Sequence, residues 1–219
     1  MKKMVYVIFL CLVSFLSQAQ EKSNIKDALQ KNYQNISSWQ ADFTQETYVE
    51  ALDKIVQKKG LIAVKKPGRL KIIYTADPKK TYTSNSKKLW VYSEENQEVL
   101  VFKKMSKLVA GEALDFLNGL GELDLQFEVL NYPKNEASKA LITAKNLELL
   151  ELVPRDTESV LDRIVLAVKP QTNQILEMTL FNESGNKTHY IFTNIVFNTN
   201  PPDSFFEFVK PKGVREVNQ

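Results

Sequence analysis

The residue types that most often carry chemistry in enzymes are scarce in this sequence of 219 residues. It has a single histidine, His189, and a single cysteine, Cys11. This excludes a cysteine or histidine zinc cluster, a disulfide framework, a haem attachment motif and a two-histidine metalloprotease helix. His189 lies in the strand-like segment THYIF, where a lone histidine is typical of a surface or satisfied packing position. We therefore expect no catalytic role for His189 and no metal site.

The acidic residues and the glycines give no stronger catalytic signal. Asp156 and Glu158 are close in sequence, but their segment is typical of a solvated loop, and acid–base chemistry needs two carboxylates in one cleft. Gly119 and Gly121 follow a helix-like segment and are typical of helix termination, since a phosphate-binding loop follows a strand. The sequence also lacks the Gly-x-Ser-x-Gly motif of lipid hydrolases. We expect no catalytic residue, no cofactor and no enzymatic activity.

The composition is that of a folded domain, with 43% hydrophobic and 25% charged residues. Its formal net charge of +3 is too small for a nucleic-acid-binding domain, which usually carries a basic stripe and a pI above about 9. Nucleic acid is therefore not an expected partner. The length is compatible with one domain that buries a sizeable core.

The N-terminus resembles a secretory signal peptide. Two lysines precede an apolar run over residues 4–16, and small and polar residues follow up to Ala19. The apolar run is shorter than the roughly 20 residues that a helix needs to cross a bilayer. Cys11 lies inside this run after a leucine, whereas a lipoprotein processing site needs a small residue there. We expect a signal peptide over residues 1–19, a single domain over residues 20–219, and export without a membrane-spanning helix.

The rest of the sequence has a mainly β pattern. Apolar residues at steps of three and four predict one early helix over residues 23–36. The period then changes to two, and turn residues separate the apolar runs, so we expect a series of antiparallel hairpins. A helical insert is expected at residues 105–123. The strands are expected at residues 39–43, 60–64, 70–74, 81–83, 89–92, 99–102, 126–130, 140–144, 147–153, 160–168, 175–181 and 188–197.

Four short motifs occur in order along the chain. They are ISSWQADFTQ at residues 36–45, GLIAVKKPGRL at 60–70, LWVY at 89–92 and FFEFVKPKGV at 205–214. Together they resemble the periplasmic outer-membrane lipoprotein carrier family, LolA, over nearly all of the chain that follows the signal peptide. The resemblance implies a mainly β (α+β) fold. This fold is an incomplete, strongly curved antiparallel β-barrel in which lid helices cover an apolar cavity.

The resemblance also implies a function. Members of this family are periplasmic chaperones that take acylated lipoproteins from an inner-membrane ABC-type exporter to the outer membrane. There an outer-membrane lipoprotein receptor accepts them, where the cell has one. Burial stabilises an acyl chain by about 0.8 kcal/mol per methylene, so the chains of a lipoprotein need a covered apolar cavity in water. ATP hydrolysis by the exporter supplies the work of extraction, so a monomeric carrier needs no catalytic residue.

The cavity residues follow from the resemblance, position by position. An ordinary dry core has the same composition as a lipid cavity, so core packing is the alternative for each of them. The expected cavity residues are Tyr33, Trp39, Phe43, Leu70, Ile72 and Tyr82, with Leu114 and Leu117 in the lid.

The chain departs from the family at the contact that holds the lid. Many carriers have an arginine directly before the proline that is Pro67 here, and this arginine hydrogen-bonds carbonyl groups of the lid helix. This chain has Lys66 at that position and Arg69 three residues later. Lysine offers a point charge where arginine offers a planar fork. We expect either that Lys66 holds the lid more weakly or that Arg69 takes over.

A second function stays open at the level of sequence. An envelope lipid-binding or lipid-sensing module of the same fold, carrying another lipid, would need a similar cavity. Such modules usually carry a second domain. The residues expected in the cavity do not by themselves distinguish lipoproteins from other lipids.

Overall fold

The computed structural model describes residues 25–103, 116 and 123–219. The expected signal peptide, Leu114, Leu117 and most of the expected helical insert lie outside these residues. Among the described residues, no helix is both long and apolar enough to cross a membrane.

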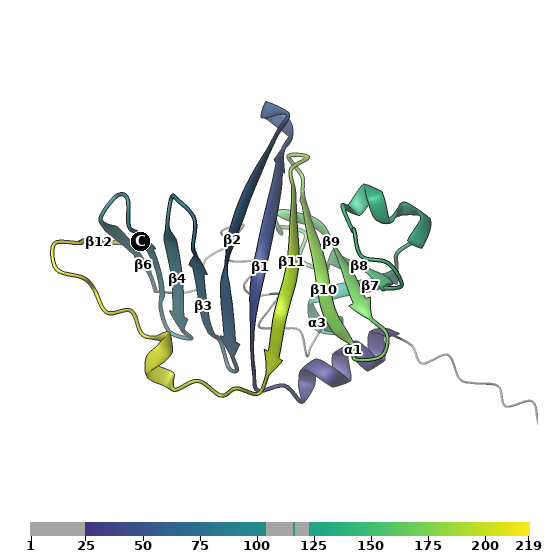
Figure 1. The fold of residues 1–219 in the computed structure, drawn as a ribbon, viewed down its shortest axis with the longest axis horizontal. Coiled ribbons are helices and arrows are strands. Elements are labelled where there is room, and N and C mark those ends of the chain that lie inside the picture. The colour runs from purple at the N-terminus through teal and green to yellow at the C-terminus, as the bar shows by residue number, and fades with distance from the viewer. Residues whose placement is uncertain (1–24, 104–115, 117–122) are drawn as a thin grey trace, which may run out of the picture.

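Twelve strands form one sheet in the order β12-β6-β5-β4-β3-β2-β1-β11-β10-β9-β8-β7 (Figure 1). The helices that lie wholly within the described residues are α1 (Ile25–Gln34) and α3 (Leu123–Gln126), with 3₁₀ helices η1 (Glu50–Leu52), η2 (Lys134–Ala140) and η3 (Asp203–Phe206). The strands are β1 (Ser38–Val49), β2 (Lys54–Lys65), β3 (Arg69–Tyr74), β4 (Lys80–Asn85), β5 (Leu89–Ser93), β6 (Glu98–Phe102), β7 (Phe127–Asn131), β8 (Glu148–Pro154), β9 (Leu161–Lys169), β10 (Gln174–Asn182), β11 (Lys187–Phe197) and β12 (Arg215–Asn218).

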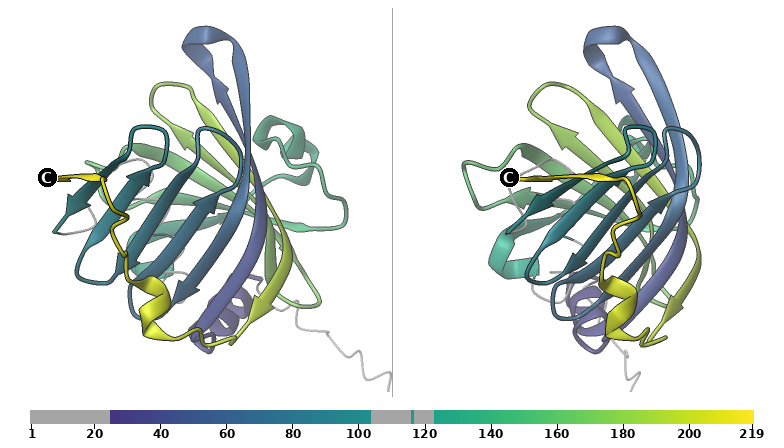
Figure 2. Two further views of the ribbon diagram at one scale, coloured as in Figure 1. Left: turned by 60° about the vertical axis from the view of Figure 1, so that its left-hand side comes forward. Right: turned by 90° about the vertical axis from the view of Figure 1, so that its left-hand side faces the viewer.

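The predicted mainly β fold is confirmed, with two corrections: one pair of neighbouring strands is parallel, and the sheet does not curl into the strongly curved barrel that was expected. All neighbouring strands are antiparallel except β12, which pairs with β6 in parallel, with Arg215 opposite Glu98. The chain after β11 runs back along one end of the sheet through η3, so it reaches the edge strand β6 in the same direction (Figure 1). The sheet is open and twisted, with β12 and β7 as the edge strands (Figure 2).

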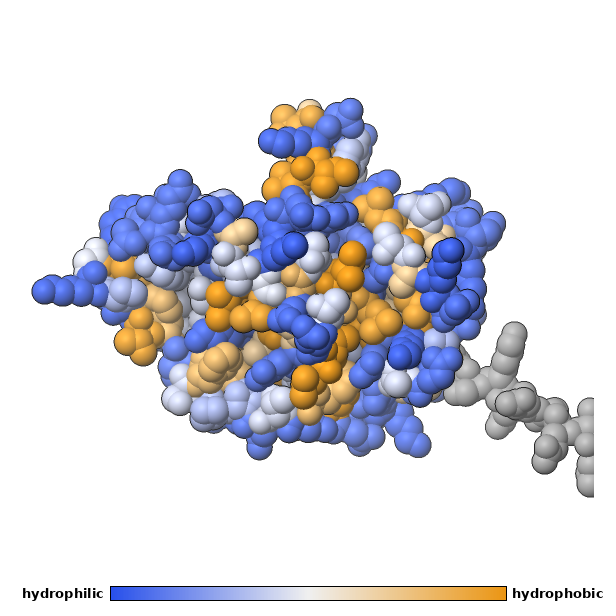
Figure 3. Space-filling model, in the orientation of Figure 1, coloured by the Kyte–Doolittle hydropathy of each residue, from blue (hydrophilic) through white to orange (hydrophobic). Residues whose placement is uncertain are grey.

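The central hairpin of β1 and β2 is longer than the sequence predicted. Its pairing runs from Ser38 opposite Lys65 to Val49 opposite Lys54, whereas β3 accompanies β2 only as far as Gly60. The hairpin therefore projects beyond its neighbours (Figure 1), and apolar surface lies at its tip (Figure 3).

The two faces of the sheet carry separate apolar clusters. We call the face that packs against α1 the inner face; it holds the main cluster of the protein. The opposite, outer face holds a smaller cluster under η2 and the segment that follows η2. The predicted strand at residues 140–144 is wrong, because this segment crosses the outer face as a turn after η2. Its backbone hydrogen bonds go partly to the side chain of Glu177 on β10.

Candidate functional site

The structure brings six of the eight expected cavity residues together on the inner face. Five of them are less than 9% exposed and belong to the main cluster, and Tyr82 is partly buried and packs against it. Leu114 and Leu117 lie outside the described residues. The five buried residues are Tyr33 from α1, Trp39 and Phe43 from β1, and Leu70 and Ile72 from β3.

Alternation along paired strands explains why these side chains share one face. Residues directly opposite each other in an antiparallel pair project from the same face. Trp39 lies opposite Val64, and Val64 lies opposite Leu70, so one row crosses three strands. Phe43 lies opposite Gly60, where an added Cβ would come within 2.6 Å of Cζ of the Phe43 ring. Only a glycine leaves room for the ring to lie across β2.

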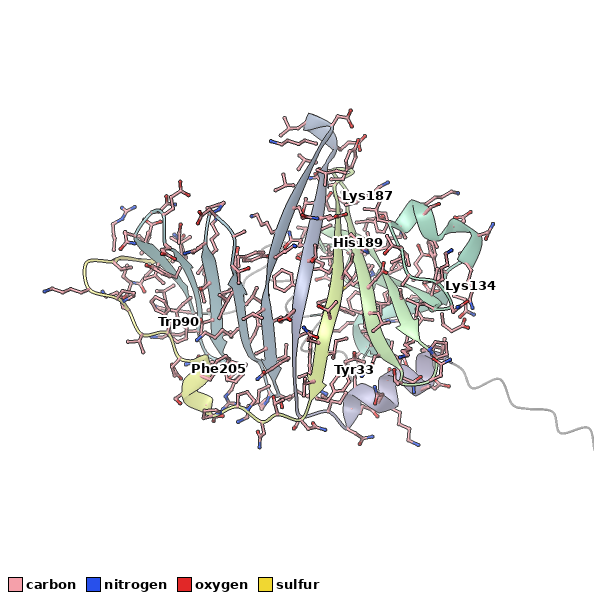
Figure 4. The ribbon with its side chains drawn as sticks, viewed as in Figure 1. Tyr33, Trp90, Lys134, Lys187, His189 and Phe205 are labelled. Carbon is pink, nitrogen blue, oxygen red and sulfur yellow. The ribbon has the colours of Figure 1, made fainter. Side chains whose placement is uncertain are left out.

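Helix α1 is fastened to both halves of the sheet at one end of the inner face (Figure 4). The Tyr33 hydroxyl accepts a hydrogen bond from the Ile175 amide at 3.3 Å, and Asn32 Nδ2 donates to the Asn173 carbonyl at 3.2 Å. Burial raises the pKa of Tyr33 to about 12, although the bond from Ile175 opposes this shift. From the other half of the sheet, Lys66 Nζ donates to the main-chain carbonyl of Tyr33.

The side chains of Lys66 and Arg69 therefore contact different elements of the protein. Lys66 reaches the last turn of α1, where the helix dipole favours a cation. Arg69 forms an ion pair with Asp203 of η3 at 3.0 Å, and Lys65 reaches the same carboxylate at 2.8 Å. The hydrogen bond from Lys65 holds the pKa of Asp203 below its usual value, and Arg69 adds to this effect. The structure places Lys66 on the helix and Arg69 on the segment after β11.

A polar row that the sequence reasoning missed borders the main cluster. The Tyr74 hydroxyl donates to Gln45 Oε1 at 2.7 Å, and Gln45 Nε2 donates to Thr47 Oγ1 at 3.1 Å. Thr47 Oγ1 lies 3.3 Å from Thr188 Oγ1. Burial raises the pKa values of Tyr74 and Tyr190, so both phenols are neutral at physiological pH. We call Gln45, Thr47, Tyr74, Thr188 and Tyr190 the polar row.

His189 occupies a packing position, which is one of the two positions, surface or packing, that its strand context predicted. It lies on β11 (Figure 4) and is 1% exposed. Its Nε2 lies 2.9 Å from Glu177 Oε2. Glu177 also accepts hydrogen bonds from the Thr143 amide and hydroxyl and from the Ala144 amide. Burial raises the pKa of Glu177, but the bonds from His189, Thr143 and Ala144 outweigh burial and lower it overall. Through these hydrogen bonds, Glu177 connects the segment after η2 to the sheet.

Asp156 and Glu158 lie in the loop between β8 and β9, as the sequence predicted. Within the described parts of the chain, no group of three or more histidine, cysteine, aspartate or glutamate residues could hold a metal ion. The inner face, with its apolar cluster and polar row, is therefore the candidate site.

Known proteins match both the sequence and the fold. The family model described as "Outer membrane lipoprotein carrier protein LolA" matches residues 34–209. An outer-membrane lipoprotein carrier protein of Hahella chejuensis is 24% identical over 94% of this chain and 95% of its own length. One of Coxiella burnetii is 25% identical over 97% of this chain and 94% of its own length.

A solved structure of an uncharacterized conserved protein from Thermus thermophilus is similar in fold. It has a TM-score of 0.55 at 11% identity and covers 89% of this chain and 97% of its own. The family match covers most of the chain and includes the β1–β3 region that forms the centre of the candidate site. The chain belongs to the family of outer membrane lipoprotein carrier proteins, LolA.

Proposed function

We propose that this protein carries acylated lipoproteins through the periplasm to the outer membrane. The observation that carries the proposal is the family match over residues 34–209, together with the main cluster on the inner face of the matched region. Membership of a carrier family also fits a protein without enzymatic activity. The relatives from Hahella chejuensis and Coxiella burnetii support the same function. Both are named outer-membrane lipoprotein carrier proteins, and both match this chain over nearly their full length.

The proposed mechanism is burial of the acyl chains against the inner face. Each methylene removed from water contributes about 0.8 kcal/mol, so a cargo with two or three chains needs an apolar surface of this kind. The open sheet acts as an incomplete barrel around the chains. Leu114 and Leu117 would complete the cavity as part of a lid, and Lys66 would hold α1 in the closed state.

The proposed route begins at the inner membrane. The signal peptide is removed before Gln20, and the mature domain, residues 20–219, acts as a monomer in the periplasm. An ABC-type exporter of the inner membrane loads the lipoprotein, and an outer-membrane receptor accepts it where the cell has one. The carrier contributes shelter and orientation, and the exporter contributes the work of extraction.

Native mass spectrometry tests this proposal directly. The protein is co-expressed with an acylated lipoprotein, or with the same lipoprotein lacking its acylated cysteine, and is purified from the periplasm. We expect a one-to-one complex with the acylated cargo alone. Free phospholipid or another lipid in place of the lipoprotein would contradict the carrier function and favour a lipid sensor. A complex with both cargo forms would contradict recognition through the acyl chains.

A further inference from the structure

The inner face changes character along β1. Trp39, Ala41 and Phe43 are buried and apolar, and the next residues on the same face, Gln45 and Thr47, are polar and half-buried. The change from apolar to polar side chains therefore falls within four residues of a continuous strand. It creates a boundary between an apolar and a polar part of the inner face.

The neighbouring strands repeat this boundary. Gln45 lies opposite Tyr190 on β11, and Thr47 lies opposite Thr188, so these side chains project from the inner face together. Tyr74 joins them from β3, and its ring packs edge-on against Phe43 with the centroids 5.4 Å apart. The polar row thus directly borders the main cluster and extends over three strands.

The polar row carries hydrogen-bond donors in a fixed arrangement. Tyr74 holds the Gln45 carbonyl oxygen, which fixes the orientation of the amide. The amide nitrogen of Gln45 has two hydrogens. Among the described residues, it donates one of them to Thr47 Oγ1. The second N–H can therefore donate to a ligand. The Tyr74 hydroxyl already donates its hydrogen to Gln45, so the second amide N–H of Gln45 is the principal donor that the polar row offers.

A lipid-modified protein has a matching chemical boundary. Its acyl chains are joined to a glyceryl-cysteine through ester and amide carbonyl groups, which accept hydrogen bonds and are costly to bury without a donor. We propose that the polar row, with Gln45 as its principal donor, binds these carbonyl groups while the main cluster receives the acyl chains. The inference rests on the proposed function and assigns the orientation of the cargo: chains toward α1, peptide toward the projecting hairpin.

The test compares a diacylglyceryl-cysteine lipopeptide with its diether analogue, in which the two ester carbonyls are replaced by methylenes. Gln45→Leu removes the donor and preserves the size of the side chain. Gln40→Leu is the matched control, because Gln40 lies on the same strand but lines a groove on the outer face. Affinities are measured by calorimetry for each protein, after thermal unfolding has shown that it is folded.

We expect the wild-type protein to bind the diester about threefold to tenfold more tightly than the diether, which is the range for one or two net hydrogen bonds. Gln45→Leu should abolish this preference, and Gln40→Leu should retain it. Should Gln45→Leu fail to fold, Tyr74→Phe removes the hydroxyl that orients the amide, and it should reduce the preference. Equal binding of the diester and the diether by the wild type would overturn the role proposed for the polar row. An unchanged preference for the diester in Gln45→Leu, or in Tyr74→Phe where that variant is used, would do the same.

Phospholipids carry the same glyceryl ester groups, so phosphatidylglycerol is tested beside the lipopeptide. Tighter binding of the lipopeptide identifies the lipoprotein as the source of the carbonyl groups, and equal binding assigns the polar row to diacylglycerol esters in general. If the wild type binds neither the diester nor the diether lipopeptide, the proposed carrier function itself fails. A missing ester preference, with both lipopeptides bound, overturns the polar-row inference alone.

Discussion

Replacing Lys66 by methionine should loosen the end of α1. The Lys66 ammonium donates to the Tyr33 carbonyl in the last turn of the helix. A hydrogen bond from a charged group contributes about 1.5–3 kcal/mol when buried, and the half-exposed position of Lys66 lowers this to about 1–1.5 kcal/mol. Methionine keeps much of the aliphatic stem and removes the donor. Local opening of α1 should become roughly fivefold to tenfold more frequent.

Amide hydrogen exchange over Ile25–Gln34 measures this opening. Lys65→Met is the control, because Lys65 is adjacent in sequence but bonds the Pro201 carbonyl and Asp203. Arg69→Ala should likewise leave α1 unchanged, since Arg69 pairs with Asp203. Unchanged exchange in Lys66→Met, or an equal increase in either control, would refute the assignment of Lys66 to the helix. An effect on lipid release in Arg69→Ala alone would instead favour Arg69 as the lid contact.

Two further substitutions test the packing around the site. Gly60→Ala should lower the free energy of unfolding by about 1–3 kcal/mol in urea titrations, because its Cβ would lie 2.3 Å from the Ile73 carbonyl oxygen; wild-type stability would contradict the close approach at β2. Glu177→Gln should lower it by about 2–4 kcal/mol at pH 7, because the donors of Thr143 and of the buried His189 lose a charged acceptor. Since the native pKa of Glu177 is lowered, its contribution is present above the ordinary carboxyl pKa of about 4.5 and is lost as the pH falls through the native value, so the variant and the wild type should converge in acid. A constant difference between them down to pH 3 would contradict an ionised Glu177 carboxylate in the native protein.

The sequence predicted the apolar part of the fold well. Helix α1 lies within the expected range of residues 23–36, and the apolar-rich strands β9 and β10 begin and end within one residue of their expected bounds. The inner-face residues from Tyr33 to Ile72 were expected from the family resemblance, because a dry core and a lipid cavity have the same composition and the sequence pattern alone does not separate them.

The sequence did not predict the polar parts of the sheet, because strands without a buried apolar face leave no period-two pattern. The outer parts of β1 and β2, residues 44–49 and 54–59, are polar or mixed, and their strand structure comes from pairing with each other and, for β1, with β11. The β12 strand is stabilised by a parallel contact with β6, far away in sequence, which no local pattern records. The polar row depends on side chains from three strands, so it becomes visible only when the register is known.

Photo-crosslinking from the two faces of the sheet tests the central claim most directly. Tyr82 on β4 packs against the main cluster, whereas Tyr92 on the adjacent strand β5 packs against Phe208 in a separate cluster. Each tyrosine is replaced in turn by benzoylphenylalanine, and the protein is loaded with a lipoprotein that carries radiolabelled acyl chains. We predict cross-links to the acyl chains from position 82 and none from position 92. Equal cross-linking from both positions, or cross-linking from position 92 alone, would contradict a carrier that shelters its cargo on the inner face.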